Sequence, residues 1–158
     1  MTALIRCMAA GALLLMFGFA GPASAEEFVG TWLTEQGEAN IRVERCGAQM
    51  CGTVVWLRDP IDPKTRKPQA DDKNPNASLR SRPILGLRIF AMDQDATGSW
   101  VGTIYNSDDG LNYRGRLSPR GDAELEVHGC TRDNLCGSEV WRRVADAAPA
   151  SPPAQNKK

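Results

Sequence analysis

The 158-residue chain lacks an excess of either charge and carries a single histidine. Its 19 basic residues balance 19 acidic ones, and no basic stripe stands out, so we do not expect nucleic acid as a partner. His128 shares one face of an alternating segment with Glu124 and Glu126, which indicates a solvated side chain. No G-x-S-x-G motif is present, so nothing points to the nucleophile of a catalytic triad. We therefore expect no catalytic residues and no cofactor.

Long apolar runs are missing as well. The longest lies at about residues 8–19, roughly a dozen residues, whereas a helix that spans a bilayer needs about 20. Arg6 precedes this run and Ala23-Ser24-Ala25 follows it, which is the pattern of a secretory signal peptide with its cleavage site. We therefore interpret residues 1–25 as a signal peptide, and we expect a periplasmic or secreted protein without a transmembrane segment once it is removed.

Removal of residues 1–25 leaves four of the five cysteines, namely Cys46, Cys51, Cys130 and Cys136. An even number of cysteines in a short exported chain implies disulfides. We favour the pairs Cys46–Cys51 and Cys130–Cys136 because each brackets a turn, but the two connectivities that link one hairpin to the other remain open. The spacings C-x4-C and C-x5-C differ from the C-x2-C pairs of zinc sites, so we expect no metal site.

Helical periodicity is absent beyond the signal peptide, and the mature chain instead contains short alternating segments. In residues 39–45, for example, apolar and polar side chains alternate, which is the period of a half-buried strand. Turn-forming sequences such as residues 106–110 separate the segments. Eight segments have strand character: residues 28–34, 39–45, 52–57, 84–92, 99–105, 112–117, 123–127 and 138–144.

Eight strands joined mostly by hairpins predict an all-β fold, a small antiparallel up-and-down barrel. The interior of such a barrel is either filled by side chains or holds one small ligand. We assign residues 26–144 to this single domain. The Ala/Pro-rich residues 145–158 are expected to form a disordered tail, and the oligomeric state is left open.

One segment, residues 58–83, interrupts the strand pattern with five prolines and many charged residues. Proline cannot donate to a β-ladder, so we expect a loop, and a loop of this length in a compact domain is often functional. The alternative is a surface insertion without a role. Lys73, Arg80 and Arg82 lie in this segment and are candidates to meet an anionic head group, although charged loop residues are more often simply solvated.

Several short motifs occur in an order that resembles a known family. They are Gly30-Thr31-Trp32, Cys46 to Cys51-Gly52, Trp56-Leu57, Asp72-Lys73-Asn74-Pro75, Arg82 to Leu87, Gly102 to Asn106, Asp109-Gly110, Tyr113, Gly129-Cys130 and Trp141-Arg142. Over about residues 28–143 the chain looks like domain-of-unknown-function family 2147, small secreted proteins of Gram-negative bacteria. The resemblance implies a lipocalin-like β-barrel in the periplasm or outside the cell, and it implies no activity and no catalytic residues.

The motif Gly30-Thr31-Trp32 also resembles the lipocalin G-x-W signature. In lipocalins that tryptophan closes one end of the barrel beneath an arginine from late in the chain. The resemblance implies that Arg142 or Arg143 makes such a cation–π contact with Trp32. The alternative is a core tryptophan with an unrelated surface arginine.

Six aromatic residues are spread over the predicted strands and are candidates to line a ligand site: Trp32, Trp56, Trp100, Tyr105, Tyr113 and Trp141. An apolar, aromatic-lined interior with few polar groups is the usual form of a small-molecule site, although the same residues would also fill a solid core. The leading hypothesis is a non-enzymatic barrel that binds a small apolar or amphiphilic molecule. One alternative is an envelope protein–protein interaction module acting through residues 58–83, and a third is a hydrolase or isomerase working inside the barrel.

Overall fold

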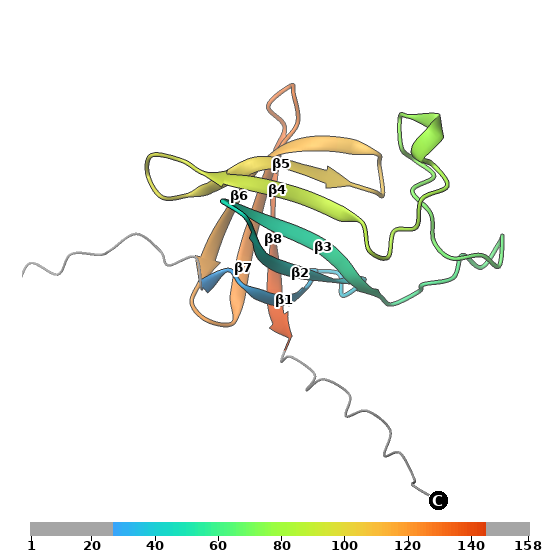
Figure 1. Ribbon diagram of the computed structural model, residues 1–158, viewed down its shortest axis with the longest axis horizontal. Coiled ribbons are helices and arrows are strands. Elements are labelled where there is room, and N and C mark those ends of the chain that lie inside the picture. Colours follow the sequence, from blue (N-terminus) through green and yellow to red (C-terminus); the bar gives the residue numbers. More distant parts are fainter. Residues whose placement is uncertain (1–26, 145–158) are drawn as a thin grey trace, which may run out of the picture.

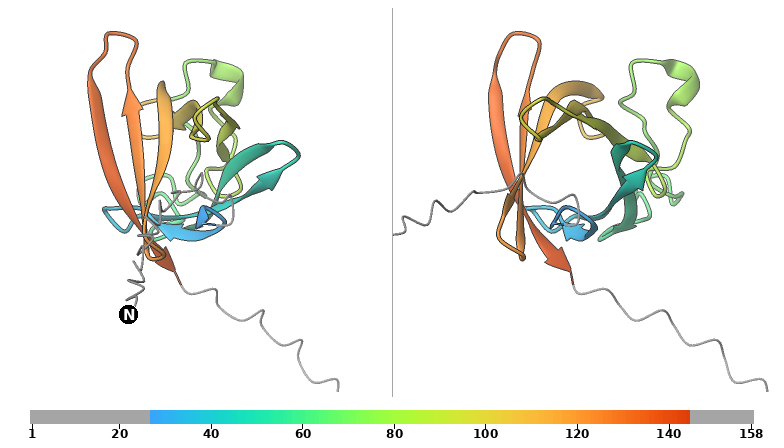
Figure 2. Two further views of the ribbon diagram at one scale, coloured as in Figure 1. Left: turned by 90° about the vertical axis from the view of Figure 1, so that its left-hand side faces the viewer. Right: turned by 60° about the vertical axis from the view of Figure 1, so that its left-hand side comes forward.

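Eight antiparallel strands pair in sequence order, and β1 pairs with β8 to close the barrel. The computed structural model describes residues 27–144, so the predicted signal peptide and C-terminal tail lie outside the described residues. The strands are β1 (Gly30–Leu33), β2 (Ala39–Cys46), β3 (Gln49–Leu57), β4 (Arg88–Gln94), β5 (Trp100–Asn106), β6 (Leu111–Arg120), β7 (Glu124–Cys130) and β8 (Cys136–Val144). The predicted all-β up-and-down barrel is confirmed. Figure 1 labels its strands, and the right-hand view of Figure 2 shows them as a ring.

The strands form where side chains alternate between core and outer face. In β7, Leu125 and Val127 are buried inside the barrel. Glu124, Glu126 and His128 alternate with them along the strand and therefore lie on the outer face. Within the described residues, no helix is long and apolar enough to cross a membrane.

Two strands begin three or four residues away from their predicted starts, whereas the other six begin within two residues of theirs. Strand β3 starts at Gln49 instead of residue 52, because its pairing with β2 continues to Cys46 opposite Gln49. Strand β4 starts at Arg88 instead of residue 84. Residues 84–87 form a turn in which the Leu87 amide donates to the Ile84 carbonyl at 2.9 Å. Ile84 and Leu87 are buried whereas Leu85 is 52% exposed, so the apolar run resembles a strand in sequence although its backbone forms a turn.

One end of the barrel is packed solid. Trp32 is 0% exposed, and its Nε1 donates a hydrogen bond to the Phe28 carbonyl at 2.9 Å. The Phe28 ring meets the Trp100 ring edge-on, with centroids 6.5 Å apart. The side chains that fill this end are each 2% exposed or less: Phe28, Trp32, Val43, Met50, Met92, Trp100, Leu117 and Leu125. We call this the closed end of the barrel.

Arg143 covers the closed end from outside. Its guanidinium carbon lies 4.1 Å from the centroid of the Trp32 ring. The guanidinium also donates to three backbone carbonyls, those of Glu27, Val29 and Asp122, at 2.5–2.8 Å. Arg143, and not Arg142, therefore makes the cation–π contact that the lipocalin resemblance implies.

The two favoured cysteine pairs lie at disulfide distance. Cys46 and Cys51 close the hairpin between β2 and β3, with Cα atoms 5.9 Å apart. Cys130 and Cys136 close the hairpin between β7 and β8, with Cα atoms 4.0 Å apart. The connectivities that would link one hairpin to the other are not the ones found.

Replacing both Cys46 and Cys51 by alanine is expected to lower the free energy of unfolding by about 2–3 kcal/mol, because a short disulfide-closed loop lies at the low end of disulfide effects. The measurement is urea unfolding of the double variant and the parent under non-reducing conditions. A parent whose melting temperature does not change on reduction would contradict this expectation.

Residues 58–83 form a hydrogen-bonded loop beside the barrel, drawn in green in Figure 1. Ile61 bridges to Pro68 and Ala70 bridges to Pro83, so the segment folds back on itself twice. A short 3-10 helix, η2 (Ala77–Leu79), has Asn76 as its N-cap, whose side chain accepts a hydrogen bond from the Ser78 amide. The polar backbone of the segment is therefore paired locally.

Candidate functional site

The end of the barrel away from Trp32 contains an open cavity of about 1020 Å³. Pockets that bind small molecules typically measure about 300–1,000 Å³, so the space is sufficient for one such molecule. Apolar side chains from six of the strands and from the turn before β4 form its floor: Ile41, Val54, Leu57, Ile84, Ile89, Ile104, Val127 and Trp141. Ile41, Val54 and Val127 are also part of the buried core, so one hydrophobic core continues from the closed end to the cavity.

The rim of the cavity carries more negative than positive side chains. Six carboxylates line it, Glu35, Glu38, Asp59, Asp72, Asp108 and Glu139, against two cations, Arg58 and Lys73. Both cations are already paired: Arg58 Nη2 lies 2.9 Å from Glu38 Oε1, and Lys73 Nζ lies 3.5 Å from Asp72 Oδ2. The excess of charge at the rim is therefore negative.

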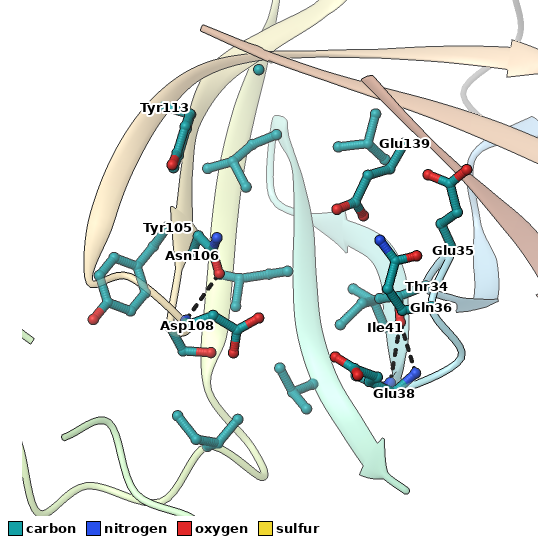
Figure 3. Close-up of a pocket in the computed structure, with 18 of the residues that line it drawn as sticks. Thr34, Glu35, Gln36, Glu38, Ile41, Tyr105, Asn106, Asp108, Tyr113 and Glu139 are labelled. Carbon is teal, nitrogen blue, oxygen red and sulfur yellow. Dashed lines mark hydrogen bonds between the residues drawn. The ribbon is translucent and has the colours of Figure 1, made fainter. Parts of the chain in front are cut away.

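Asp108 lies in the turn between β5 and β6 and faces Glu38, Glu35 and Glu139 across the cavity (Figure 3). Burial raises the pKa of the Asp108 carboxyl above its ordinary value, and the negative charges of Glu38 and Asp109 raise it further. These are two separate effects that act in the same direction, since partial loss of hydration and nearby like charges both disfavour the ionised carboxylate. A cation bound at the rim would relieve that repulsion.

Glu139 joins the rim to the apolar floor. It precedes Trp141 by two residues on β8, so both side chains share the inner face of the strand. The Trp141 Nε1 donates a hydrogen bond to Glu139 Oε2 at 2.9 Å. The carboxylate is therefore held at the level where the apolar floor meets the charged rim.

Asp71 fixes the 58–83 segment to the barrel wall. Its side chain is 0% exposed and accepts three hydrogen bonds, from Tyr105 Oη at 2.5 Å, Asn74 Nδ2 at 2.7 Å and Arg82 Nε at 2.7 Å. Burial acts to raise the pKa of Asp71, but these hydrogen bonds and the Arg82 charge outweigh it, so the pKa lies below its ordinary value. The ionised form of Asp71 is the one that this network stabilises.

This anchoring makes part of the segment a wall of the cavity. Tyr105 and four residues that flank Asp71 all line the cavity, the four being Gln69, Ala70, Asp72 and Lys73. The segment also packs on the turn before β6, where a Cβ added to Gly110 would lie 2.1 Å from the Lys73 carbonyl oxygen. Gly110 has φ +73°, so both its backbone and its contact with the segment require glycine.

The six predicted aromatic site residues fall into three groups. Tyr105, Tyr113 and Trp141 line the cavity. Trp32 and Trp100 fill the closed end instead, because they lie on the inner face but at the other end of the barrel. Trp56 lies opposite Asn40 next to a bulge in β3, and it is 43% exposed on the outside of the barrel.

The three predicted basic site residues bind atoms of their own segment. Lys73 lines the cavity and pairs with Asp72. Arg82 binds Asp71 and stacks over the Tyr105 ring at 5.5 Å, and Arg80 Nε donates to the Asn74 carbonyl at 2.7 Å. Neither Arg80 nor Arg82 lines the cavity, so their cationic groups stabilise the segment.

The sequence pattern did not single out the acidic rim. Glu139 carries a usable signal, because it shares the inward face with Trp141 at a spacing of two. Glu38 and Asp108 sit beside turns, where acidic residues are ordinary, and only closure of the barrel brings them to one opening. A local pattern could not have paired them.

Comparisons with known proteins agree with this fold. The model of the family described as "Uncharacterized protein conserved in bacteria (DUF2147)" matches residues 30–143. Among solved structures, the chain is similar to protein HP1028 from the human pathogen Helicobacter pylori, which is described as belonging to the lipocalin family. The TM-score is 0.62 at 20% sequence identity, over 75% of this chain and 84% of that chain, a likeness of fold alone. No curated protein sequence matches the chain.

Proposed function

The chain belongs to the DUF2147 family, and from that premise we propose that its lipocalin-like barrel binds one small amphiphilic molecule. The observation that carries the proposal is the open cavity of about 1020 Å³ in a barrel whose other end is packed. A barrel that served only as a rigid support would bury more apolar surface by filling this space. Concave, largely apolar cavities with a few polar groups at one side are the usual form of small-molecule sites.

The floor favours an apolar portion in the ligand. Leu57, Ile89 and Ile104 line it and are half-buried, so these side chains would lose contact with water when an apolar group enters. Burial of apolar surface contributes about 25 cal/mol per Å², and this term favours an alkyl chain or a ring system over a sugar or a peptide. The apolar portion would point towards the closed end.

The rim favours a cationic group at the other end of the ligand. Its negative charge exceeds its positive charge, and both of its cations are paired with carboxylates. A bound cation near Asp108 and Glu139 would be attracted by both carboxylates, whereas an anion would be repelled. This charge distribution supports a cationic amphiphile over the anionic head group for which Lys73, Arg80 and Arg82 were candidates.

The alternative functions have weaker support. An interaction module acting through residues 58–83 would use exposed apolar side chains such as Ile61 and Leu79, which are 49% and 37% exposed, but it gives no role to the cavity. A hydrolase or isomerase would need an oriented base or nucleophile beside the substrate. His128 lies on the outer face of β7, and the four described cysteines are paired.

We place the protein outside the cytoplasm as part of the same proposal. Two disulfides in one small domain suit an oxidising compartment, and the apolar run of residues 8–19 with its A-x-A site suits export. The test is fractionation of cells that produce the full chain, combined with the mass of the mature protein. A cytoplasmic protein that retains residue 1 would contradict this placement.

The experiment for ligand binding compares two probes with the same twelve-carbon tail, dodecyltrimethylammonium and dodecanoate, titrated below micelle formation. The cation is expected to bind about five- to tenfold more tightly, because one favourable charge contact at a partly exposed rim is worth about 1 kcal/mol. Native mass spectrometry of protein isolated from periplasm, before and after denaturation, would identify a ligand that copurifies. Failure to bind either probe, together with a ligand-free native mass, would contradict the proposed function.

The matched variants are Asp108→Asn at the rim and Asp133→Asn in the exposed turn between β7 and β8. Asp108→Asn is expected to reduce the preference for the cationic probe, and Asp133→Asn is expected to leave it unchanged. Equal binding of both probes by all three proteins would contradict the charge preference and leave the apolar site in place.

A further inference from the structure

A second group of possible metal ligands lies on the outer face of the β7–β8 hairpin, beside the cavity wall to which Cys136 also contributes. His128 and Cys130 are two residues apart on β7 and therefore share a face. Cys136 on β8 is the direct partner of Cys130 across the ladder. The His128 ring and the two sulfur atoms offer ligand atoms that all lie within 4.8 Å of one another. Figure 2 shows this hairpin extending beyond the neighbouring strands.

The imidazole of His128 is already oriented for ligation. Its Nδ1 lies 2.9 Å from Ser138 Oγ, and its Nε2 lies 3.3 Å from Cys130 Sγ. When Nδ1–H donates to the Ser138 hydroxyl, the lone pair of Nε2 points at the sulfur. A second hydrogen bond of this kind is the usual device that fixes the tautomer and ring orientation of a metal-binding histidine.

We propose that reduction of the Cys130–Cys136 disulfide converts this hairpin into a binding site for one soft divalent cation of the zinc type. A dithiol or phosphine reductant supplies two electrons, the S–S bond breaks, and two protons give the two thiols. The cation then displaces both thiol protons and binds two thiolates and the Nε2 of His128. The disulfide and the metal-bound form exclude each other, so the site is present only in the reduced protein.

The donor set suits this class of cation. Thiolate and imidazole ligands select zinc and related soft ions over calcium or magnesium. Two thiolates neutralise a divalent cation, so the bound site has no net charge beside Arg114 and Arg116, which pair in register with Cys130 and His128. Three protein ligands leave the fourth tetrahedral position for water or for an exogenous ligand.

The other disulfide lacks these features and serves as an internal control. Cys51 is 2% exposed, whereas Cys136 is exposed and Cys130 half-buried, so a reductant reaches the Cys130–Cys136 bond more readily. Among the described residues, the group of metal-type ligands that lie within reach of one another contains His128, Cys130 and Cys136 and neither Cys46 nor Cys51. The C-x5-C spacing did not predict a metal site, because the third ligand, His128, lies outside that motif. Strand alternation and the pairing of β7 with β8 bring it beside the two sulfur atoms.

The test is alkylation of the full chain after reduction with a phosphine in oxygen-free buffer, with and without Zn²⁺, read out by peptide mass spectrometry. Zn²⁺ is expected to slow alkylation of Cys130 and Cys136 by about tenfold or more, the scale of effects at metal sites, with Cys46 and Cys51 unprotected in the same molecules. In a parallel titration, the reduced protein should bind one Zn²⁺ per chain and the oxidised protein none.

His128→Ala should weaken Zn²⁺ binding by about tenfold or more, whereas Glu126→Ala, on the same face of β7, should leave it unchanged. The circular dichroism of the reduced chain establishes whether the barrel persists without its disulfides. Equal protection of both cysteine pairs would identify simple dithiol chelation and overturn the proposal. Absence of protection, whether the reduced barrel persists or unfolds, would overturn it as well.

Discussion

Replacing Trp32 by alanine is expected to lower the free energy of unfolding by about 3–5 kcal/mol, the range for removing a large aromatic side chain from a packed core. Trp32 is 0% exposed, so its loss leaves a void among side chains that are themselves fully buried. The substitution also removes the hydrogen bond to the Phe28 carbonyl and the ring beneath the Arg143 guanidinium. Urea unfolding followed by far-ultraviolet circular dichroism measures the effect.

Trp56→Ala is the matched control because it removes the same side chain from the outside of the barrel. Trp56 is 43% exposed, so its replacement is expected to cost about 1 kcal/mol or less. Trp32 does not line the cavity, so the folded fraction of Trp32→Ala should keep the probe affinity of the parent. Equal losses of stability for the two variants would contradict the assignment of Trp32 to the closed end.

The strands of this fold could be predicted because alternation is a local signal. Leu125 and Val127 of β7 carry it clearly, since each lies between polar neighbours and both are buried. The start of β4 could not be predicted in the same way. Ile84 and Leu87 are buried like strand residues but belong to a turn. An apolar run in a sequence does not indicate whether its backbone pairs with another strand.

The site could be predicted only in part, because alternation gives the face of a residue and not its depth in the barrel. Trp100 and Trp141 both point inward, yet Trp100 fills the closed end and Trp141 lines the cavity. Depth depends on the stagger between strands, which is a property of the closed barrel. The acidic rim depends on it too, since Glu38 and Asp108 are 70 residues apart in sequence.

Neighbouring aspartates give the clearest case of information that is absent from the sequence. Asp71 and Asp72 are adjacent and chemically identical, and both suit a turn. Asp71 is fully buried under Tyr105, whereas Asp72 is exposed and pairs loosely with Lys73 at 3.5 Å. The difference arises because the 58–83 segment turns the Asp71 side chain towards the barrel and leaves the Asp72 side chain in solvent. The two aspartates therefore form a matched pair for mutagenesis.

Asp71→Asn is expected to destabilise the 58–83 segment by about 2–3 kcal/mol, somewhat less than the 3–5 kcal/mol for breaking a fully buried ion pair, because the Arg82 side chain is 35% exposed. Asparagine has nearly the same volume but carries no charge, and its N–H₂ group replaces either the oxygen that accepts from Tyr105 or the oxygen that accepts from Asn74 and Arg82. At least one of these buried donors would lose its acceptor. Limited proteolysis within residues 58–83 and hydrogen exchange of the same segment measure the loss.

The same contact predicts a pH dependence of the segment. The pKa of Asp71 is lower in the folded protein than its ordinary value, so the folded state favours the ionised carboxylate. Its contribution to stability is complete above the unfolded pKa of about 3.9 and is lost as the pH falls from there through the lower folded pKa. The parent segment should therefore become protease-sensitive in acid below about pH 4, whereas the Asp71→Asn segment should be sensitive already at neutral pH.

Asp72→Asn is the control that distinguishes the loss of the Asp71 contacts from a general effect of removing a carboxylate. Asp72 is exposed, so its replacement is expected to change stability by about 0.5 kcal/mol or less. Because residues 69–73 form part of the cavity wall, Asp71→Asn should also weaken binding of dodecyltrimethylammonium, and Asp72→Asn should weaken it less despite removing a carboxylate from the rim itself. If both variants released the segment equally, or if Asp71→Asn left the probe affinity unchanged, the buried aspartate would not be the feature that connects the segment to the site.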